Sequence, residues 1–281
     1  MITKEQVLPF IYLAFAEDVR DGDHSSLACI PQEKIGRAHL LVKDKGIIAG
    51  IQLAKWIFES IDPKLKVNDL LKDGNAVKKG DIVFTVEGSS ISILTAERLV
   101  LNCMQRMSAI ATKTKEYVAL VKGTNTTILD TRKTTPGIRI LEKWAVRIGG
   151  GANHRFGLYD MIMLKDNHID YAGGITKAIE KTRSYLKEKN LDLKIEVEAR
   201  DLKEVREIIL MGGIDRIMLD NFTPTETIIA VQLINGAFET ESSGGITEKT
   251  IRSYAECGVD FISVGALTHS VYNMDLSLKA F

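Results

Sequence analysis

Two adjacent cations, Arg132 and Lys133, lie in the segment DTRKTTPG, which follows the apolar run TTIL at residues 126–129. Such a run is typical of a buried strand, and a protein core does not accommodate two neighbouring charges without partners. An anion must therefore meet them, either a solvent counterion or a ligand. Because an arginine side chain can match a carboxylate or a phosphate with two parallel hydrogen bonds, this pair predicts a binding site for an anionic ligand.

Further basic groups follow in the same part of the chain. Residues 130–168 contain seven Lys or Arg, four Asp or Glu and two His, although the whole chain of 281 residues has a formal net charge of zero. Arg155 and Lys165 stand at or near the ends of expected strands, so both are candidates for the same ligand. The glycines of GGGANHR allow a bend that brings His154 and Arg155 into the site, but the segment lacks the GK[ST] of a P-loop.

Two carboxylates end expected strands of their own. Glu198 closes KIEVE and Asp220 closes RIMLD. Opposite a set of basic groups they fit Mg2+ shared with a phosphorylated ligand, because magnesium binds a few carboxylates together with water and substrate oxygens. Ion pairs with the basic groups are the alternative. Glu196 precedes Glu198 by two residues and points to the same face of the strand, so either glutamate could be the working carboxylate.

Small residues follow the last two expected strands, in SSGG and SVGAL. Glycine allows backbone N–H groups to approach a phosphate closely, and the start of a following helix adds a favourable dipole. The loops after the last two strands are also the usual phosphate position of α/β barrels. The predicted phosphate-binding residues are Ser243, Gly244, Gly245, Ser263, Val264 and Gly265.

Short apolar strands alternate with helices from about residue 126 onward. N-cap residues with an acidic partner three positions later mark two helix starts, Asp201 with Glu204 and Thr223 with Glu226. The alternation predicts a parallel sheet with right-handed crossovers, and its even spacing favours a closed or nearly closed barrel. Polar residues follow every strand, so we expect the site at the carboxyl ends of the strands. The expected strands are TTIL, DMIML, KIEVE, RIMLD, AFETES and FISVG.

The N-terminal part mixes strands and helices. Thr3 and Gln6 form a capping box for an amphipathic helix over about residues 4–19. GRAHLLVKDKGIIAG predicts a strand that bends at glycines, WIFESI a helix, and VKKGDIVFTVEGSSISIL two short strands joined by EGSS. A long helix is expected from Thr95 to Val121. VLPFIYLAFA could instead be the core of a signal peptide, but Glu5 and the acidic EDVRDGD that follows do not fit one.

The overall composition argues against several classes of protein. Zero net charge gives no bias toward nucleic acid or a membrane surface, and no apolar run is long enough to span a bilayer. Cys29, Cys103 and Cys257 lie far apart and form no C-x-x-C, which argues against a zinc knuckle, a disulfide framework or a redox pair. We therefore expect a cytoplasmic protein without a nucleic-acid or membrane partner.

Seven segments, in this order along the chain, resemble the quinolinate phosphoribosyltransferase family, also called nicotinate-nucleotide pyrophosphorylases (carboxylating). They are TAERLVLNCMQRMSAIAT, DTRKTTPGIR, EKWAVRIGGGANHRFGLYDMIMLKDNH, EVEA, IMLDNF, SSGGI and ISVGALTHS. The resemblance implies a hammerhead-like α/β sandwich over residues 1–108 and an incomplete α/β barrel of parallel strands over residues 109–267. It also implies that the tail, about residues 268–281, joins the sandwich and that the protein is a homodimer.

The same resemblance implies a reaction and roles for the residues singled out above. With Mg2+, quinolinate and phosphoribosyl pyrophosphate would give nicotinate mononucleotide, pyrophosphate and CO2. Lys133, Glu198 and Asp220 would be catalytic, and the two acids would also hold the metal, partly through water. The spacing of these two acids is one residue longer than in the family. Quinolinate would be bound by Thr131, Arg132, His154, Arg155, Lys165 and, from the neighbouring subunit, Arg98.

Other readings of the sequence remain open. A paralogous transferase of the same fold, specific for nicotinate or associated with molybdate transport, would share most of these features. Lys165 at a strand end could form a Schiff base, as in an aldolase barrel, and a sugar-phosphate isomerase barrel would also use strand-end residues. A non-enzymatic carrier is suggested by GNAVKKGDIVFTVEG, which resembles the hammerhead of biotinyl and lipoyl carriers, although Lys78 and Lys79 lack the pattern of a modified hairpin tip.

Overall fold

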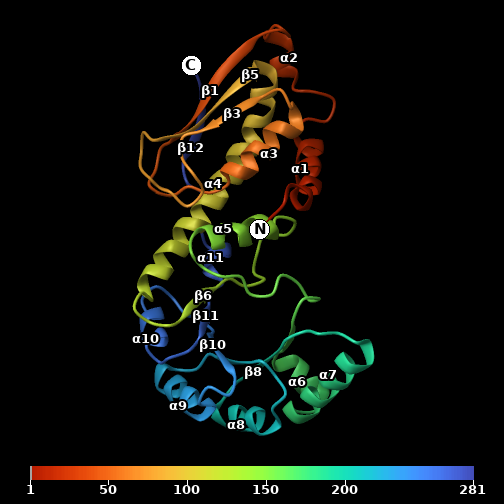
Figure 1. Ribbon diagram of the computed structural model, residues 1–281, viewed down its shortest axis with the longest axis vertical. Helices are drawn as coiled ribbons and strands as arrows, with labels where there is room; N and C mark the ends of the chain where they lie inside the picture. The colour runs from red at the N-terminus through yellow and green to blue at the C-terminus, as the bar shows by residue number, and fades with distance from the viewer. Residues whose placement is uncertain (1) are drawn as a thin grey trace. The chain divides into compact units, whose positions relative to one another are not determined.

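The computed structural model describes residues 2–281, which divide into two compact units (Figure 1). The first unit comprises residues 2–115, 134–150 and 266–281, and the second comprises residues 116–133 and 151–265. The predicted boundary lay at residue 108. The structure differs mainly in assigning residues 134–150, which follow the Arg132–Lys133 pair, to the first unit.

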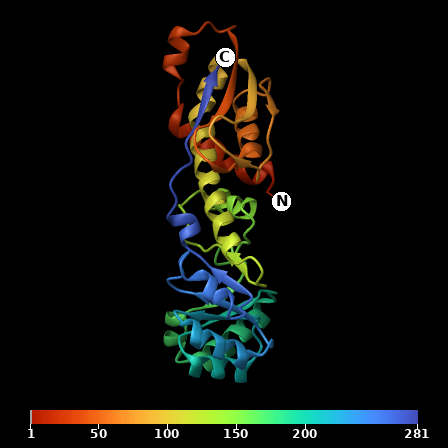
Figure 2. The ribbon, with the colours of Figure 1, turned by 90° about the vertical axis from the view of Figure 1, so that its left-hand side faces the viewer.

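The first unit contains a four-stranded antiparallel sheet in the order β12-β1-β5-β3. Its strands are β1 (Ile35–Val42), β3 (Lys66–Asp69), β5 (Ile82–Ser89) and β12 (Leu276–Ala280), and a separate two-stranded ladder joins β2 (Gly46–Ile47) to β4 (Ala76–Val77). Figure 2 shows β12, the blue C-terminal strand, running beside β1. Alternate residues of β1, namely Ala38, Leu40 and Val42, are buried, which is the pattern of a sheet with one face on a core.

The helices of the first unit supply the rest of its core. They are α1 (Lys4–Asp18), α2 (His24–Cys29), α3 (Ile51–Ile61), α4 (Ser90–Leu120, which continues into the second unit), α5 (Arg139–Ile148) and α11 (Ala266–His269). Phe58 of α3 and Phe84 of β5 meet edge to face, with ring centroids 6.1 Å apart. The predicted cap of α1 is confirmed, since the amide of Thr3 donates to the side-chain oxygen of Gln6 at 3.0 Å.

Two features of the first unit differ from the sequence prediction. The strand expected at ISIL is wrong, because these residues form the first turns of α4, which begins at Ser90 rather than Thr95. Ile93, Ala96 and Val100 are all buried, so a helical spacing of three to four residues runs through the segment. The strand Lys66–Asp69 was not predicted, because its mostly exposed, polar residues carry no apolar signal.

Six parallel strands form the sheet of the second unit, in the order β6-β11-β10-β9-β8-β7. They are β6 (Thr127–Leu129), β7 (Ile162–Leu164), β8 (Ile195–Ala199), β9 (Arg216–Asp220), β10 (Glu239–Ser243) and β11 (Phe261–Ser263). All six expected strands are present. Because β6 and β7 end the order without pairing with each other, the sheet is an incomplete barrel.

Helices on the outside of this sheet connect its strands (Figure 1). They are α6 (Asp166–Ala172), α7 (Ile175–Lys189), α8 (Leu202–Met211), α9 (Pro224–Ile234) and α10 (Ile251–Ala255). Both predicted N-caps are confirmed. The Asp201 carboxylate accepts the Glu204 amide at 2.8 Å, and the Thr223 hydroxyl accepts the Glu226 amide at 3.3 Å. Within residues 2–281, none of the helices is both long enough and apolar enough to cross a membrane.

Strand register places charged side chains on one face of this sheet. Glu196 of β8 pairs in register with Arg216 of β9, which in turn pairs with Glu239 of β10. Two residues further along the same face lie Glu198 and Glu241. Branched apolar residues usually fill these positions in α/β barrels, so the barrel interior here is unusually polar.

Candidate active site

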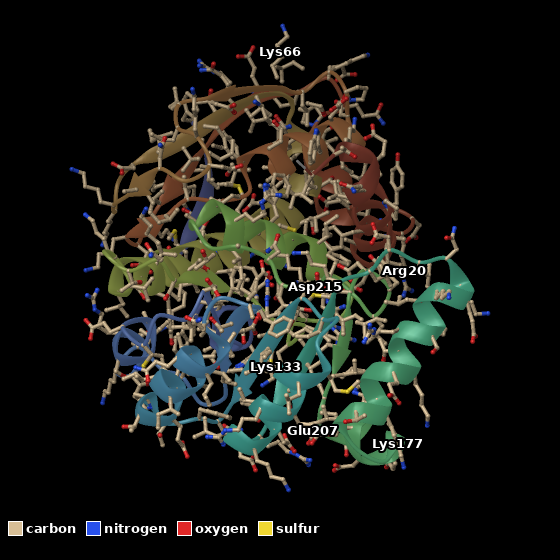
Figure 3. All side chains as sticks on the ribbon, turned by 60° about the horizontal axis from the view of Figure 1, so that its bottom comes forward. Arg20, Lys66, Lys133, Lys177, Glu207 and Asp215 are labelled. Carbon is tan, nitrogen blue, oxygen red and sulfur yellow. The ribbon has the colours of Figure 1, made fainter. Side chains whose placement is uncertain are left out.

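The Arg132–Lys133 segment leaves the barrel directly after β6. The amide of Lys133 donates to the Thr131 hydroxyl at 3.0 Å, which forms a tight turn. Arg132 is half-buried and Lys133 is exposed. Figure 3 labels Lys133 among the side chains of the second unit. The turn thus presents two cations at the carboxyl end of a strand, as the sequence indicated.

The loop that carries Arg155 is fastened at several points. Asp130, which is fully buried, accepts the amide of His154 at 2.9 Å and the side-chain amide of Asn153 at 2.6 Å. Nη1 of Arg155 donates to the carbonyl of Met161 at 3.1 Å. This leaves the guanidinium half-buried in a fixed position.

The two arginines are close enough to affect each other. Burial lowers the pKa of Arg155, and the positive charge of Arg132 lowers it further. The negative charges of Glu196 and Asp160 act on the pKa of Arg155 in the opposite direction, so the repulsion between the two guanidinium groups is offset only in part within the protein. Two neighbouring cations at the strand ends favour a shared anion site for Arg132 and Arg155.

Lys165 and Glu198 pair at the ends of neighbouring strands. Nζ of Lys165, just after β7, lies 3.0 Å from Oε2 of Glu198 on β8. The Lys165 side chain is 46% exposed, so its ammonium group can reach a ligand as well as the carboxylate. Glu198 is nearly buried at the strand end, whereas Glu196 is fully buried deeper in the strand. Of the two glutamates, Glu198 is therefore the one at the rim.

Asp220 and the first glycine loop form one packed unit. The side-chain amide of Asn221 donates to Asp220 at 2.7 Å, and its backbone amide donates to the Ser243 carbonyl at 2.9 Å. Gly244 has φ +95°, and a Cβ there would lie 2.8 Å from the backbone nitrogen of Asn221. Only glycine fits this close approach. The following helix, α10, begins at Ile251, so it does not start directly behind the loop as we had expected.

The second glycine loop, residues 263–265, makes more hydrogen bonds within the barrel than its sequence indicated. The amide of Val264 donates to the carbonyl of Leu129 at 2.9 Å, which continues the pairing of β11 with β6. The hydroxyl of Ser263 bonds to Glu241 in the barrel interior. Both groups have partners within the barrel, and the phosphate-binding roles of Ser263, Val264 and Gly265 stay predictions. A prediction from glycine content alone could not show that two of the three residues serve the sheet.

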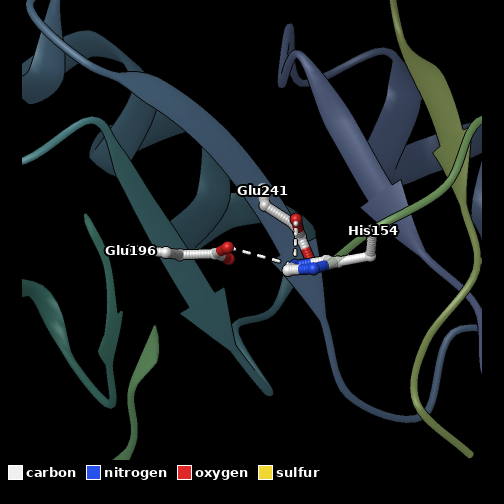
Figure 4. Close-up of side chains that lie close together, drawn as sticks. All are labelled: His154, Glu196 and Glu241. Carbon is white, nitrogen blue, oxygen red and sulfur yellow. Dashed lines mark ion pairs between the residues drawn. The ribbon is translucent and has the colours of Figure 1, made fainter. Parts of the chain in front are cut away.

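His154 points into the barrel rather than out of it (Figure 4). Its Nε2 lies 3.0 Å from Oε2 of Glu196 on β8 and 3.4 Å from Oε2 of Glu241 on β10. Nη1 of Arg216 completes the cluster, 2.9 Å from the same oxygen of Glu241. In this structure the ring of His154 is engaged by Glu196, Glu241 and the Arg155 amide, and its predicted contact with the quinolinate carboxylates stays a prediction. Sequence reasoning missed Glu241 and Arg216, whose only signal is a charge at alternate positions of a buried strand.

The protonation of this cluster follows from its geometry. Burial would lower the pKa of His154, but the two carboxylates outweigh burial and raise it to about 9. Such a pKa by itself would give an imidazolium with a proton on both nitrogens. Nδ1, however, accepts the Arg155 amide at 2.6 Å, so the ring proton lies on Nε2. Since burial and the charge of Glu241 raise the pKa of Glu196, we assign the additional proton to Glu196.

With that proton in place, the cluster carries no net charge, because the Arg216 guanidinium balances the Glu241 carboxylate. His154, Glu196 and Glu241 form the one close group of potential metal ligands found among residues 2–281. A divalent cation there would have to share Glu241 with the guanidinium at 2.9 Å. The cluster is therefore balanced without a metal. Glu198 and Asp220, on one face of adjacent strands, are the better pair for magnesium, which needs only one or two carboxylates besides substrate oxygens.

Arg98 lies in the first unit, exposed on α4. Its predicted contact with the quinolinate of a second subunit depends on the dimer and stays a prediction.

The second unit has cations and carboxylates at the carboxyl ends of its parallel strands and glycine turns beside them. This combination defines an α/β-barrel enzyme that acts on anionic substrates. The chain matches the C-terminal domain of quinolinate phosphoribosyl transferase over residues 110–279 and the N-terminal domain over residues 23–108. It belongs to the quinolinate phosphoribosyltransferase family, and it is a phosphoribosyltransferase.

Individual relatives agree with this assignment. The chain is 49% identical to the chloroplastic nicotinate-nucleotide pyrophosphorylase (carboxylating) of Arabidopsis thaliana, with 96% of this chain and 81% of the relative covered. It is 41% identical to a probable enzyme of the same name from Bacillus subtilis, covering 94% and 90%. Its fold matches the crystal structure of NadC from Streptococcus pyogenes with a TM-score of 0.94 at 38% identity, over 99% and 97% of the two chains.

Proposed function

We propose that this enzyme transfers phosphoribose from phosphoribosyl pyrophosphate to quinolinate and removes one carboxylate, giving nicotinate mononucleotide, pyrophosphate and CO2. The observation that carries the proposal is the pair of neighbouring guanidinium groups, Arg132 and Arg155, held at the strand ends of a barrel of this family. Quinolinate carries two adjacent carboxylates, and a doubly negative ligand is the kind of partner that offsets the repulsion between two arginines.

The remaining basic groups complete the proposed quinolinate site. Lys165 would hold a carboxylate from the opposite side, and the Thr131 hydroxyl would lie beside it. Lys133, exposed on the same turn as Arg132, would stand between quinolinate and the pyrophosphate group. These fixed cations bring together two anions that would otherwise repel each other, which lowers the barrier by positioning and by charge stabilisation.

Glu198 and Asp220 would bind the ribose hydroxyls and Mg2+, partly through water. Both lie near the carboxyl ends of adjacent parallel strands and face the same side of the sheet, so their donor set suits a hard cation. When bound, magnesium supplies positive charge to the departing pyrophosphate. Lys165 already contacts Glu198, so this lysine would restrain the carboxylate that orients the ribose. The two glycine loops, chiefly Gly244, Gly245 and Gly265, would receive the 5′-phosphate.

The chemistry needs no nucleophilic side chain, because the ring nitrogen of quinolinate attacks the sugar carbon itself. Once ribosylated, this nitrogen is positive, and it stabilises the carbanion that remains after the neighbouring carboxylate leaves as CO2. This carbanion then takes up a proton to give nicotinate mononucleotide. The protein contributes orientation, fixed positive charge and exclusion of water. A homodimer in which Arg98 of one subunit reaches the other subunit's quinolinate would add one more cation.

The decisive experiment combines the purified protein with Mg2+, phosphoribosyl pyrophosphate and quinolinate, followed by chromatography. We expect nicotinate mononucleotide and CO2 in equal amounts, and loss of turnover when a chelator removes the metal. Product from nicotinate but not from quinolinate would instead indicate a nicotinate-specific enzyme and would refute the proposal. Trapping with borohydride tests the Schiff-base alternative in the same sample.

We also propose that the enzyme works in the cytoplasm, a view supported by three cysteines that all remain free thiols in the structure. Several plant relatives are named as chloroplastic or mitochondrial, so the matching experiment is fractionation of cells followed by detection of this chain. Its recovery in a membrane or organelle fraction would refute the cytoplasmic location.

A further inference from the structure

A column of charged side chains runs through the interior of the barrel to the loop that carries Arg155. It begins at Glu239, the first residue of β10, whose Oε2 lies 3.2 Å from Nε and 3.0 Å from Nη2 of Arg216. Arg216 also lies over the ring of Phe261, with Cζ 3.9 Å from the ring centroid. Its third nitrogen, Nη1, contacts Glu241 at 2.9 Å. The guanidinium is therefore fixed on three sides.

Glu241 connects the fixed guanidinium of Arg216 to His154, which lies nearer the carboxyl ends of the strands. Its Oε2 contacts both Arg216 and Nε2 of His154, and the Ser263 hydroxyl bonds to the same carboxylate. The side chain of Glu241 is fully buried. In a closed interior this carboxylate has little room to move, and the imidazole of His154 lies at ion-pair distance from it.

His154 connects the column to the ligand-binding loop. Its Nδ1 accepts the amide of Arg155, and its own amide is held by Asp130. In Figure 4 the imidazole extends from the segment beside β6 toward β8 and β10, so it bridges the interior of the incomplete barrel. Movement of the ring would therefore move the backbone from which the Arg155 guanidinium projects.

We propose that Glu241 and Arg216 are positioning residues for quinolinate binding, which act through His154 to hold Arg155 in place. This inference rests on the proposed function, because it assigns Arg155 to quinolinate. Neither residue touches substrate in this account. Their removal should weaken the binding of quinolinate and leave the binding of phosphoribosyl pyrophosphate, which we assign to the carboxyl ends of β9 and β10 rather than to their interior, largely unchanged.

The test uses Glu241→Gln in the full-length enzyme, which keeps the shape of the side chain but weakens its hold on Arg216. We expect KM for quinolinate to rise at least about tenfold, since a charge-assisted contact to a carboxylate is of this size, with KM for phosphoribosyl pyrophosphate unchanged within about twofold. A merely structural role would lower the folded fraction, so that the apparent kcat falls and neither KM moves. Glu207→Gln is the matched control.

Glu207 suits this purpose because it lies on α8 (Figure 3) and accepts hydrogen bonds from Thr176, away from the column. Its loss should change neither KM. Should Glu241→Gln fail to fold, Arg216→Lys provides a second variant. It keeps the charge balance, but an ammonium group cannot span Glu239 and Glu241 as the guanidinium does. We expect the same selective rise in KM for quinolinate, several-fold in size.

The outcomes separate this inference from the proposed function. Absence of product from the unaltered enzyme with quinolinate would overturn the function itself. An active unaltered enzyme, together with folded variants whose KM for quinolinate stays within about twofold, would overturn only the positioning role. A parallel rise in both KM values would also overturn it, because it would indicate a general loss of site structure.

Discussion

Replacing Arg106 by Met should destabilise the first unit strongly, because it leaves a buried carboxylate without its cationic partner. Glu142 of α5 is completely buried, and Oε1 accepts hydrogen bonds from Nε and Nη2 of Arg106 at 3.0 and 2.8 Å. The same guanidinium donates to the carbonyl of Thr268. Breaking a buried pair by removing one partner usually costs about 3–5 kcal/mol. Thr135 still donates its amide and hydroxyl to Glu142, so we expect the lower end, about 3 kcal/mol.

Urea denaturation followed by tryptophan fluorescence measures this loss directly. The two tryptophans of the chain, Trp56 and Trp144, lie in the first unit with ring centroids 5.7 Å apart, so their emission reports on that unit. Lys4→Met is the control, because its partner Glu59 is half exposed and surface pairs contribute at most about 1 kcal/mol.

A double variant completes the argument. Arg106→Met with Glu142→Met removes both charges, and it should be less destabilised than Arg106→Met alone, because no unpaired charge is left in the interior. The reasoning would be refuted if the single variant lost less than about 1 kcal/mol, or if the double variant were the less stable of the two.

Three further predictions concern the second unit. Arg132→Ala and Lys133→Ala should each lower kcat/KM at least about a hundredfold, since each removes a charge contact in a site that excludes water; near-normal kinetics would place them outside the site. Gly244→Ala should lower both activity and thermal stability, because its Cβ would lie 2.8 Å from the Asn221 nitrogen; an unchanged melting temperature would contradict the assigned backbone fit. The folded cluster of His154 and Glu196 holds one additional proton, assigned above to Glu196, up to about pH 9, whereas in the unfolded chain the histidine releases this proton near its ordinary pKa of 6.5. Stability should thus be greatest below pH 6.5 and fall by up to about 1.4 kcal/mol per pH unit toward pH 9. Urea midpoints followed by circular dichroism measure this slope, and a midpoint that rises over the same range would contradict it.

Much of the second unit could be predicted because its signals are local. Asp201 and Thr223 cap helices in the structure as their sequence contexts indicated, and each caps through a contact only three residues away. The prediction of a strand at ISIL was wrong because the local signal is ambiguous. A short apolar run fits both a strand and a buried helix, and the length of α4 decided between them.

The direction of loop side chains could not be predicted from sequence. His154 stands beside Arg155 in a glycine-rich loop, and nothing in the pattern shows that one ring turns inward while its neighbour stays near the rim. Glu241 illustrates the same limit. AFETES predicts a strand, but an acidic residue in a strand is usually solvent-facing, and its burial follows only from partners on other strands.

The buried charges inside the barrel can be explained by the arginine pair at the carboxyl ends of its strands. The positive charge of Arg132 acts against that of Arg155, and side chains that are free to move would separate. An apolar interior could fill the barrel, but it could not hold the backbone of residue 155 by a directional contact. His154, anchored by Glu196 and Glu241, provides that contact at 2.6 Å from the Arg155 amide. Burying such groups seldom adds stability, so we infer that this polar interior serves the geometry of the arginine pair.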